Sequence, residues 1–185
     1  MAFSRGGPKL RRPRQPLAEP ALFDYAVAML ARRMRTEREL RRLMQTRAEP
    51  GPTGLAAMDA VIRRLVELNY LSDTRFAADY TRLRKEGQKL GRRRVQQDLA
   101  AKGIASDLVG AAITTAYEGI DEPTLAREYI ARKRMKQPSG PNAQKETART
   151  MGRLLRAGFS AATVFKVLKD WGVEVEEFEV EKGSD

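Results

Sequence analysis

The feature that most restricts the fold of this chain is a short motif that occurs three times. An acidic residue followed by tyrosine stands at Asp24-Tyr25, Asp79-Tyr80 and Glu128-Tyr129, separated by 55 and then 49 residues. Each pair lies in a stretch whose apolar residues recur at three- and four-residue steps, the period of an amphipathic helix. This spacing indicates a helical unit repeated in tandem, in which each unit packs mainly on its neighbours.

Three helices are expected in each unit, because proline, glycine and capping residues interrupt the apolar stripes at regular places. The predicted helices cover 20–34, a stretch between Thr36 and Glu49, 55–69, 73–86, 92–102, 106–117, 123–136, 143–157 and 160–171. Thr36, Ser72, Ser106 and Ser160 are expected to cap the helices that follow them. Gly87 is expected to end the helix over 73–86.

The apolar stripes also predict which side chains are buried. Leu68 and Leu83 continue the stripes of their helices, so we expect both to face the core. Tyr80 follows Ala77 by three residues, and the other two tyrosines of the motif stand in the same register after Leu22 and Ala126. We therefore interpret Tyr80 as a core residue.

The sequence thus predicts an all-α protein of three tandem three-helix repeats that form an elongated, curved array. The expected repeats span 20–70, 71–119 and 120–172. Residues 1–19 are rich in proline and basic residues and show no helical period, so we interpret them as a disordered arm. Residues 173–185 hold six acids and one lysine and are interpreted as a solvated acidic tail.

The composition argues against catalysis. The chain has no cysteine and no histidine, which removes thiolate metal ligands, the commonest general base and the commonest metal-binding side chain. The serines are explained as helix caps or lie in loops and tails, and no glycine-rich phosphate-binding loop occurs. We therefore expect no enzyme activity, no metal and no other cofactor. No apolar run approaches the length of a membrane span, and a cytoplasmic protein is expected.

The charge of the chain favours an anionic partner. Thirty-five basic and 24 acidic residues give a net charge of +11. The charge is clustered, with eight basic and two acidic residues between Arg82 and Lys102. Further basic residues end a helix of the third repeat, and Lys145, Arg149, Arg153 and Arg156 follow on the next helix. The candidate binding residues are Arg82, Arg84, Lys85, Lys89, Arg92, Arg93, Arg94, Arg132, Lys133 and Arg134.

Three of these candidates, Arg92–Arg94, stand at the start of a predicted helix, where the helix dipole disfavours cations. Local helix stability therefore does not explain them, and binding of an anion or an acidic surface is the leading interpretation. Aromatic residues make up only 6% of the chain and are not interleaved with the cations, so base stacking is not expected. Groove recognition by a helix remains open.

The stretch from Leu71 to Ile104 also resembles a known family. The matching residues are Leu71, Asp73, Arg75, Phe76, Ala77, Tyr80, Arg82 and Arg84, then Leu90, Gly91, Arg93, Arg94, Leu99, Lys102, Gly103 and Ile104. This pattern resembles the RecX family of regulatory proteins, and the resemblance extends more weakly over residues 20–172. Family members often carry Gly-Pro before the basic helix, whereas Gly91 is followed here by Arg92.

The resemblance implies a negative regulator of the RecA recombinase, acting in DNA repair, recombination and the SOS response. Such a protein binds the RecA filament on single-stranded DNA and inhibits ATP hydrolysis and strand exchange. The partners expected here are the RecA filament and single-stranded DNA, with double-stranded DNA as a further candidate. No membrane is expected as a partner, and the protein is expected to be a monomer. A non-catalytic DNA-binding protein or repressor is the alternative, and dependence on RecA separates the two.

Overall fold

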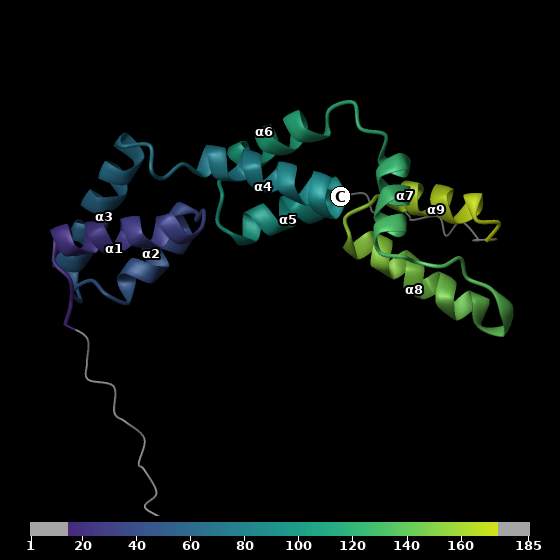
Figure 1. The fold of residues 1–185 in the computed structure, drawn as a ribbon, viewed down its shortest axis with the longest axis horizontal. Coiled ribbons are helices and arrows are strands. Elements are labelled where there is room, and N and C mark those ends of the chain that lie inside the picture. The colour runs from purple at the N-terminus through teal and green to yellow at the C-terminus, as the bar shows by residue number, and fades with distance from the viewer. Residues whose placement is uncertain (1–14, 174–185) are drawn as a thin grey trace, which may run out of the picture. The chain divides into compact units, whose positions relative to one another are not determined.

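The computed structural model describes residues 15–173, which form helices joined by short connections (Figure 1). The helices are α1 Glu19–Arg32, α2 Glu37–Gln45, α3 Pro52–Glu67, α4 Asp73–Gln88, α5 Arg92–Ala101, α6 Ser106–Tyr117, α7 Glu122–Arg132, α8 Ala143–Arg156 and α9 Ala161–Asp170, with a 3-10 turn over Gly140–Asn142. Between residues 15 and 173 the only β pairing is an isolated bridge of Leu17 with Ala48. The all-α prediction is confirmed. The parts of the expected arm and tail at 1–14 and 174–185 lie outside the described residues.

The chain divides into two compact units, Met1–Leu71 and Ser72–Asp185. The first unit contains α1, α2 and α3, which pack on one another. In the second unit, α4, α5 and α6 form one group of mutually packed helices, and α7 and α8 both pack on α9. The predicted grouping of the helices in threes is therefore confirmed. The division of the second unit into separate repeats at residue 120 stays a prediction.

The first unit is held by an apolar core that its three helices share. The core residues are Leu22, Ala26, Leu40, Met44, Met58, Val61, Ile62, Leu65 and Leu71. The predicted cap of α2 is present, since the Thr36 hydroxyl accepts a hydrogen bond from the Glu39 backbone N–H at 3.1 Å. The prediction that Leu68 is buried is wrong, because α3 ends at Glu67 and the side chain of Leu68 is 47% exposed.

The second unit has one continuous core to which all six of its helices contribute. Val95 and Leu99 of α5 and Leu154 of α8 are fully buried in it. Phe159, in the turn between α8 and α9, is also buried and meets the Tyr129 ring edge-on at a centroid distance of 5.7 Å. A shared core makes α4–α9 one packing unit, so residues on different helices keep fixed positions relative to one another.

Several predicted helix boundaries in the second unit need correction. The helix α4 continues through Gly87 and ends at Gln88, where Lys89 takes a left-handed conformation with φ 57°. Leu83 on α4 is 57% exposed, so it does not face the core. The N-cap of α6 is Ala105 rather than Ser106. The caps predicted at Ser72 and Ser160 are present, since each accepts a hydrogen bond from the backbone N–H three residues on.

The acid-tyrosine motif marks buried positions only in part. Leu22, Ala77 and Ala126, three residues before the tyrosines, are fully buried. Tyr129 is also buried, but Tyr80 is only half-buried. The interpretation of Tyr80 as a core residue is therefore correct only in part, because Tyr80 packs against the core of the second unit but is half-buried. The ring of Tyr80 stacks on Phe76 while its hydroxyl reaches a polar neighbour, which keeps one edge of the side chain at the surface.

Two glycines join α5 to the end of α8. The Gly91 N–H donates to the Ala157 carbonyl at 2.9 Å, and the Arg93 N–H donates to the Gly158 carbonyl at 3.3 Å. The backbones approach so closely that a Cβ atom on Gly91 would lie 2.4 Å from the carbonyl carbon of Gly158. The free N–H groups at the start of α5 are thus paired with the free carbonyl groups at the end of α8.

This contact predicts a different outcome for two glycine-to-alanine changes. Gly91→Ala should lower the free energy of unfolding by about 1–3 kcal/mol, because Gly91 has φ −72° and only the close contact forbids a side chain. Gly110→Ala, at an exposed position of α6 where a Cβ meets nothing within 4 Å, should raise it by about 0.5–1 kcal/mol. Denaturant unfolding of both variants measures the difference. Equal effects of the two changes would contradict the contact.

A carboxylate network fixes the start of α7 to the start of α9. The Ser160 N–H donates to Glu122 Oε1 at 3.1 Å, and the hydroxyl groups of Ser160 and Thr163 both donate to Glu122 Oε2. Burial alone would raise the pKa of Glu122, but these hydrogen bonds and the nearby charge of Arg93 outweigh it and lower the pKa below 4.5. The ionised carboxylate is therefore the form that stabilises the fold.

The lowered pKa predicts a pH-dependent effect of Glu122→Gln. Because the folded-state pKa lies below the unfolded value, the stabilisation is present above about pH 4.5 and is lost as the pH falls through the folded-state pKa. We expect Glu122→Gln to cost about 1 kcal/mol at pH 7, since the group is partly screened by solvent. Unfolding of both proteins between pH 3 and pH 7 measures the difference, which should shrink below pH 4. A difference that does not change with pH would contradict this account.

Candidate functional site: a basic cleft

A cleft of about 520 Å³ in the second unit gathers arginines from three helices. Arg84 lies on α4, Arg94 on the first turn of α5, and Arg153 and Arg156 on the last turn of α8. The cleft is lined by Tyr80, Arg84, Gln88, Leu90, Arg94, Asp98, Tyr129, Arg153, Arg156 and Ala157. Four guanidinium groups and one carboxylate give its lining a net charge of +3. We define these ten residues as the basic cleft.

Asp98 orders one side of the basic cleft. Its Oδ1 atom lies 3.0 Å from Arg94 Nε, and its Oδ2 atom accepts a hydrogen bond from the Tyr80 hydroxyl at 3.1 Å. The Arg84 guanidinium lies over the Tyr80 ring, 4.7 Å from its centroid. Burial, together with the charge of Asp98, raises the pKa of Tyr80, so its hydroxyl stays protonated and donates. Arg84 and Arg94 are therefore held in place before any ligand arrives.

The other side of the basic cleft carries unpaired charge. Arg153 and Arg156 are exposed, and neither has an acidic partner among residues 15–173. The Arg156 guanidinium folds back over its own helix at Gly152, where a Cβ atom would lie 3.1 Å from Nη1. Their place in the last turn of α8 suits the helix dipole. Their guanidinium groups remain available to a phosphate or carboxylate, which arginine binds in a bidentate manner.

Only two of the ten predicted site residues, Arg84 and Arg94, line the basic cleft. Two others bind the carbonyl groups at the end of α6: Lys85 Nζ donates to Ala116 O at 2.8 Å, and Arg92 Nη2 donates to Tyr117 O at 3.5 Å. Cations at this position offset the negative end of the α6 dipole. Lys85 and Arg92 therefore have a role in the fold.

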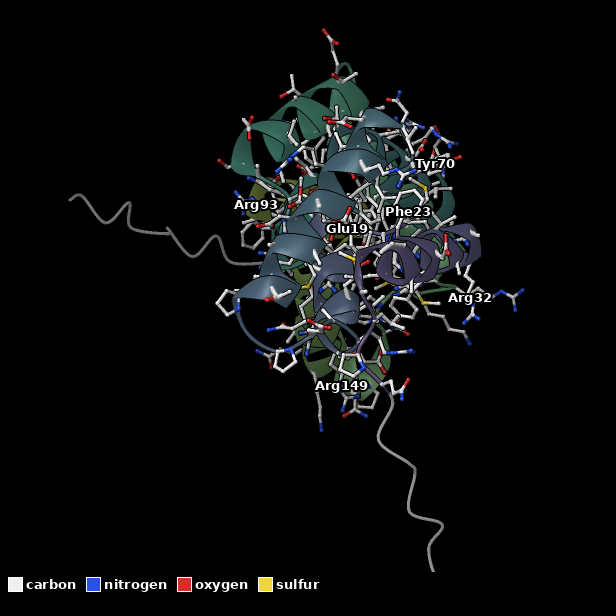
Figure 2. The ribbon with its side chains drawn as sticks, turned by 90° about the vertical axis from the view of Figure 1, so that its left-hand side faces the viewer. Glu19, Phe23, Arg32, Tyr70, Arg93 and Arg149 are labelled. Atoms are coloured by element: carbon white, nitrogen blue, oxygen red, sulfur yellow. The ribbon has the colours of Figure 1, made fainter. Side chains whose placement is uncertain are left out.

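The remaining candidates are spread over the second unit. Arg82 pairs with Asp79 and Glu86 on its own helix, and Lys89 Nζ lies 2.8 Å from Glu128 Oε2 of α7. Arg93 is exposed (Figure 2). Arg132 ends α7, Lys133 lies over the Tyr129 ring, and Arg134 follows with φ 48°. Lys133 therefore contacts Tyr129 of the basic cleft, but none of Arg132, Lys133 and Arg134 belongs to the cleft lining.

Two of the three arginines Arg92–Arg94 have partners in the fold, and the role of all three in binding an anion stays a prediction. Arg92 contacts the end of α6, and Arg94 pairs with Asp98 one turn along α5. The α5 dipole does disfavour these cations. The sequence pattern could not reveal that carbonyl groups of α6 lie close to Arg92, whereas the four-residue spacing of Arg94 and Asp98 on one helix was visible in the sequence. Arg93 is the member of the three whose side chain remains exposed without an ion pair within the described range.

Arg153 and Arg156 of α8 line the basic cleft but were not among the predicted site residues. They lie 59 and 62 residues after Arg94, and no local pattern links them. The available signal was the alignment of Lys102-Gly103-Ile104 with Ala157-Gly158-Phe159 between repeats. That alignment marks equivalent turns. It does not show that the second turn packs on the start of α5.

The first unit also exposes cations, but several of them have partners. Arg41 pairs with Glu37 and Asp59, and the Arg64 guanidinium lies 4.3 Å from the centroid of the Phe23 ring. Figure 2 shows Phe23 on α1 and the side chain of Arg32 projecting from the end of that helix. Arg41 and Arg64 thus contribute to the surface packing of this unit.

Residues 15–173 contain no group of three or more acidic side chains arranged to hold a metal ion. None of the helices in that range has the length and apolar character needed to span a membrane.

Comparison with known proteins identifies what the second unit is similar to. Residues 72–113 match the family model described as RecX, second three-helix domain. This range covers α4, α5 and most of α6, and it contains Arg84, Arg94 and Asp98 of the basic cleft. The sequence motif from which the family was predicted lies almost entirely within it.

Whole-chain comparisons agree with this match. The chain is 27% identical over 157 residues to the regulatory protein RecX of Streptomyces coelicolor, covering 85% of this chain and 79% of that protein. It is 29% identical to RecX of Thermobifida fusca, with 80% and 79% covered. For RecX of Geobacillus kaustophilus the identity is 28%, and the match spans 86% of this chain but only 57% of that longer protein.

The fold is also that of solved RecX structures. The crystal structure of RecX from Lactobacillus salivarius superposes with a TM-score of 0.62 at 18% identity, covering 83% of this chain and 96% of that one. A second structure, of regulatory protein RecX, gives a TM-score of 0.64 at 20% identity and covers 82% and 73%. The resemblance to the RecX family of regulatory proteins, predicted from the motif around Phe76 and Gly91, is therefore confirmed.

Proposed function

We propose that this protein is a RecX-type negative regulator that binds the RecA filament on single-stranded DNA and inhibits ATP hydrolysis and strand exchange. The observation that carries the proposal is the match of residues 72–113 to the RecX second three-helix domain. The basic cleft supports it, because its α4 and α5 side lies within the matched range and presents charge suited to an anionic partner.

The chemistry of the basic cleft fits a partner that carries phosphate or carboxylate groups. Arg153 and Arg156 offer planar guanidinium groups without acidic partners in the described range. Arg84 and Arg94 line the same cleft and are already held in place, Arg84 over the Tyr80 ring and Arg94 by Asp98. Tyr129 is buried and Tyr80 is half-buried, so neither presents a free face on which a base could stack. The cleft therefore suits a DNA backbone or an acidic protein segment better than it suits unpaired bases.

Inhibition of this kind requires binding but no chemistry. A protein that occupies acidic protein surface or DNA in a filament stabilises the bound state by its own binding energy and thereby opposes the changes that turnover needs. We propose that the protein acts as a cytoplasmic monomer on the RecA filament and on single-stranded DNA. The alternative, a DNA-binding protein without RecA specificity, would use the same cations but would act only by covering DNA.

The test is the rate of ATP hydrolysis by RecA on single-stranded DNA, measured with increasing amounts of this protein. We expect inhibition at substoichiometric ratios to RecA. The double variant Arg153→Gln/Arg156→Gln should need about tenfold more protein for the same inhibition, because each lost guanidinium contact to an anion is worth about 0.5–1 kcal/mol at a partly exposed site.

A matched control is available on α9, which contributes nothing to the lining of the basic cleft. Lys166→Gln/Lys169→Gln removes the same two charges from exposed positions and should inhibit nearly as well as the parent protein. If the parent protein does not inhibit ATP hydrolysis at any ratio to RecA, the proposed function is wrong. Inhibition that appears only when the DNA is saturated with this protein would favour the DNA-binding alternative.

Loss of the carboxylate inside the basic cleft should strengthen binding, whereas loss of its arginines should weaken it. Asp98→Asn removes the one negative charge of the lining and frees Arg94, so we expect binding to a single-stranded oligonucleotide to strengthen by about two- to fivefold at low salt. The gain should fade as salt rises, because the interaction is screened. Fluorescence anisotropy measures the affinity, with Asp107→Asn on α6 as the charge-matched control. Weaker binding by Asp98→Asn alone would mean that Asp98 acts mainly by holding Arg94 in place.

A further inference from the structure

The last twelve residues of the chain carry charge opposite to that of the basic cleft. The segment Glu174–Asp185 has six acidic residues and one lysine, a net charge of −5 in a chain whose total is +11. The basic cleft carries +3, and two of its arginines have no acidic partner among residues 15–173. The chain therefore contains both an anion site and a polyanionic segment of its own.

The connection between them is short. The helix α8 ends at Arg156 and α9 begins at Ala161, and the two helices pack on each other. The ten residues of α9 span about 15 Å, so Val173 stands roughly one helix length and one turn away from Arg156. Twelve further residues reach up to about 40 Å when extended. The acidic segment is long enough to reach the basic cleft.

The basic cleft already accommodates a carboxylate. Asp98 is bound there by Arg94 Nε and by the Tyr80 hydroxyl, which shows that this geometry suits an acidic side chain. Opposite Asp98, Arg153 and Arg156 offer the same kind of donor without an occupant from the described residues. We infer that the acidic segment Glu174–Asp185 binds the basic cleft of its own chain and competes there with the polyanionic partner.

This inference rests on the proposed role of the basic cleft as the partner-binding site, but it does not depend on RecA. A segment joined to its site by a short connection has an effective concentration on the order of millimolar. Even weak binding by the segment would then keep the cleft occupied for much of the time. A partner with many phosphate or carboxylate groups would displace the segment from the basic cleft. Anions that bind the cleft only weakly would not displace it and would be excluded.

The test uses the full-length chain with the segment neutralised. The variant carries Glu174→Gln, Glu176→Gln, Glu177→Gln, Glu179→Gln, Glu181→Gln and Asp185→Asn. Its affinity for a fluorescein-labelled single-stranded oligothymidine is measured by anisotropy at low salt. We expect the neutralised chain to bind about five- to tenfold more tightly than the parent, and this gain to shrink as salt increases.

A gain alone would not establish occupancy, because removing six negative charges favours binding of a polyanion wherever those charges stood. The neutralised segment is therefore combined with Arg153→Gln/Arg156→Gln and, separately, with the control Lys166→Gln/Lys169→Gln. If the segment occupies the basic cleft, the gain disappears in the first background and persists in the second. This is the coupling that two interacting groups show in a double-mutant cycle.

Equal gains in both backgrounds would overturn the inference, since the segment would then act through net charge or through the basic residues of 1–14. No gain in either background would overturn it as well. The proposed role of the basic cleft is tested separately in the same data. If Arg153→Gln/Arg156→Gln weakens binding while neutralising the segment has no effect, the cleft stands as the binding site and the inference alone fails.

Discussion

The second unit depends on the backbone contact between Gly91 and Gly158. Two hydrogen bonds join the start of α5 to the end of α8, and neither glycine leaves room for a Cβ atom. The contact pairs free N–H groups of one helix with free carbonyl groups of another, so both helix ends are satisfied without side chains. It also aligns the positive end of the α5 dipole with the negative end of the α8 dipole. Gly91 belongs to the motif on which the resemblance to the RecX family was based, and the close approach to Gly158 is the physical reason why no larger residue fits there.

The basic cleft is a consequence of this contact. Arg94 follows Gly91 by three residues and Arg156 precedes Gly158 by two, so the backbone contact brings the two arginines to the same place. Like charges gathered in this way repel one another, and the repulsion opposes folding. Asp98 and the Tyr80 hydroxyl relieve it on the α5 side, while solvent screens Arg153 and Arg156 on the α8 side. An anionic partner that binds the cleft would remove the repulsion that remains between the arginines.

Local structure was predictable from the sequence, and the site was predictable only in part. The helices follow from periodicity and from caps such as Thr36 and Ser160, which depend on residues three positions apart. Leu83 was misplaced because the apolar stripe of a helix is wider than the face that neighbouring helices cover, and Leu68 was misplaced because α3 ends one residue before it. Arg84 and Arg94 were found through local charge, but Arg153 and Arg156 join them only through the contact at Gly158. Periodicity carries no information on such a long-range pairing, and neither does charge counting.

The cations of the second unit fall into two groups, those that have a partner in the fold and those that have none among the described residues. Lys85 and Arg92 end on carbonyl groups of α6, and Lys89 ends on Glu128, so these charges are used within the fold. Replacing them would disturb packing and binding together, and a loss of function would not identify a contact. Arg153 and Arg156 are different, because no acidic partner holds them in the described part of the chain. An arginine without an acidic partner can be replaced with little effect on the stability of the fold, so a loss of binding in such a variant identifies a contact. The binding face of this protein is therefore best sought among its unpaired cations rather than where basic residues are densest in the sequence.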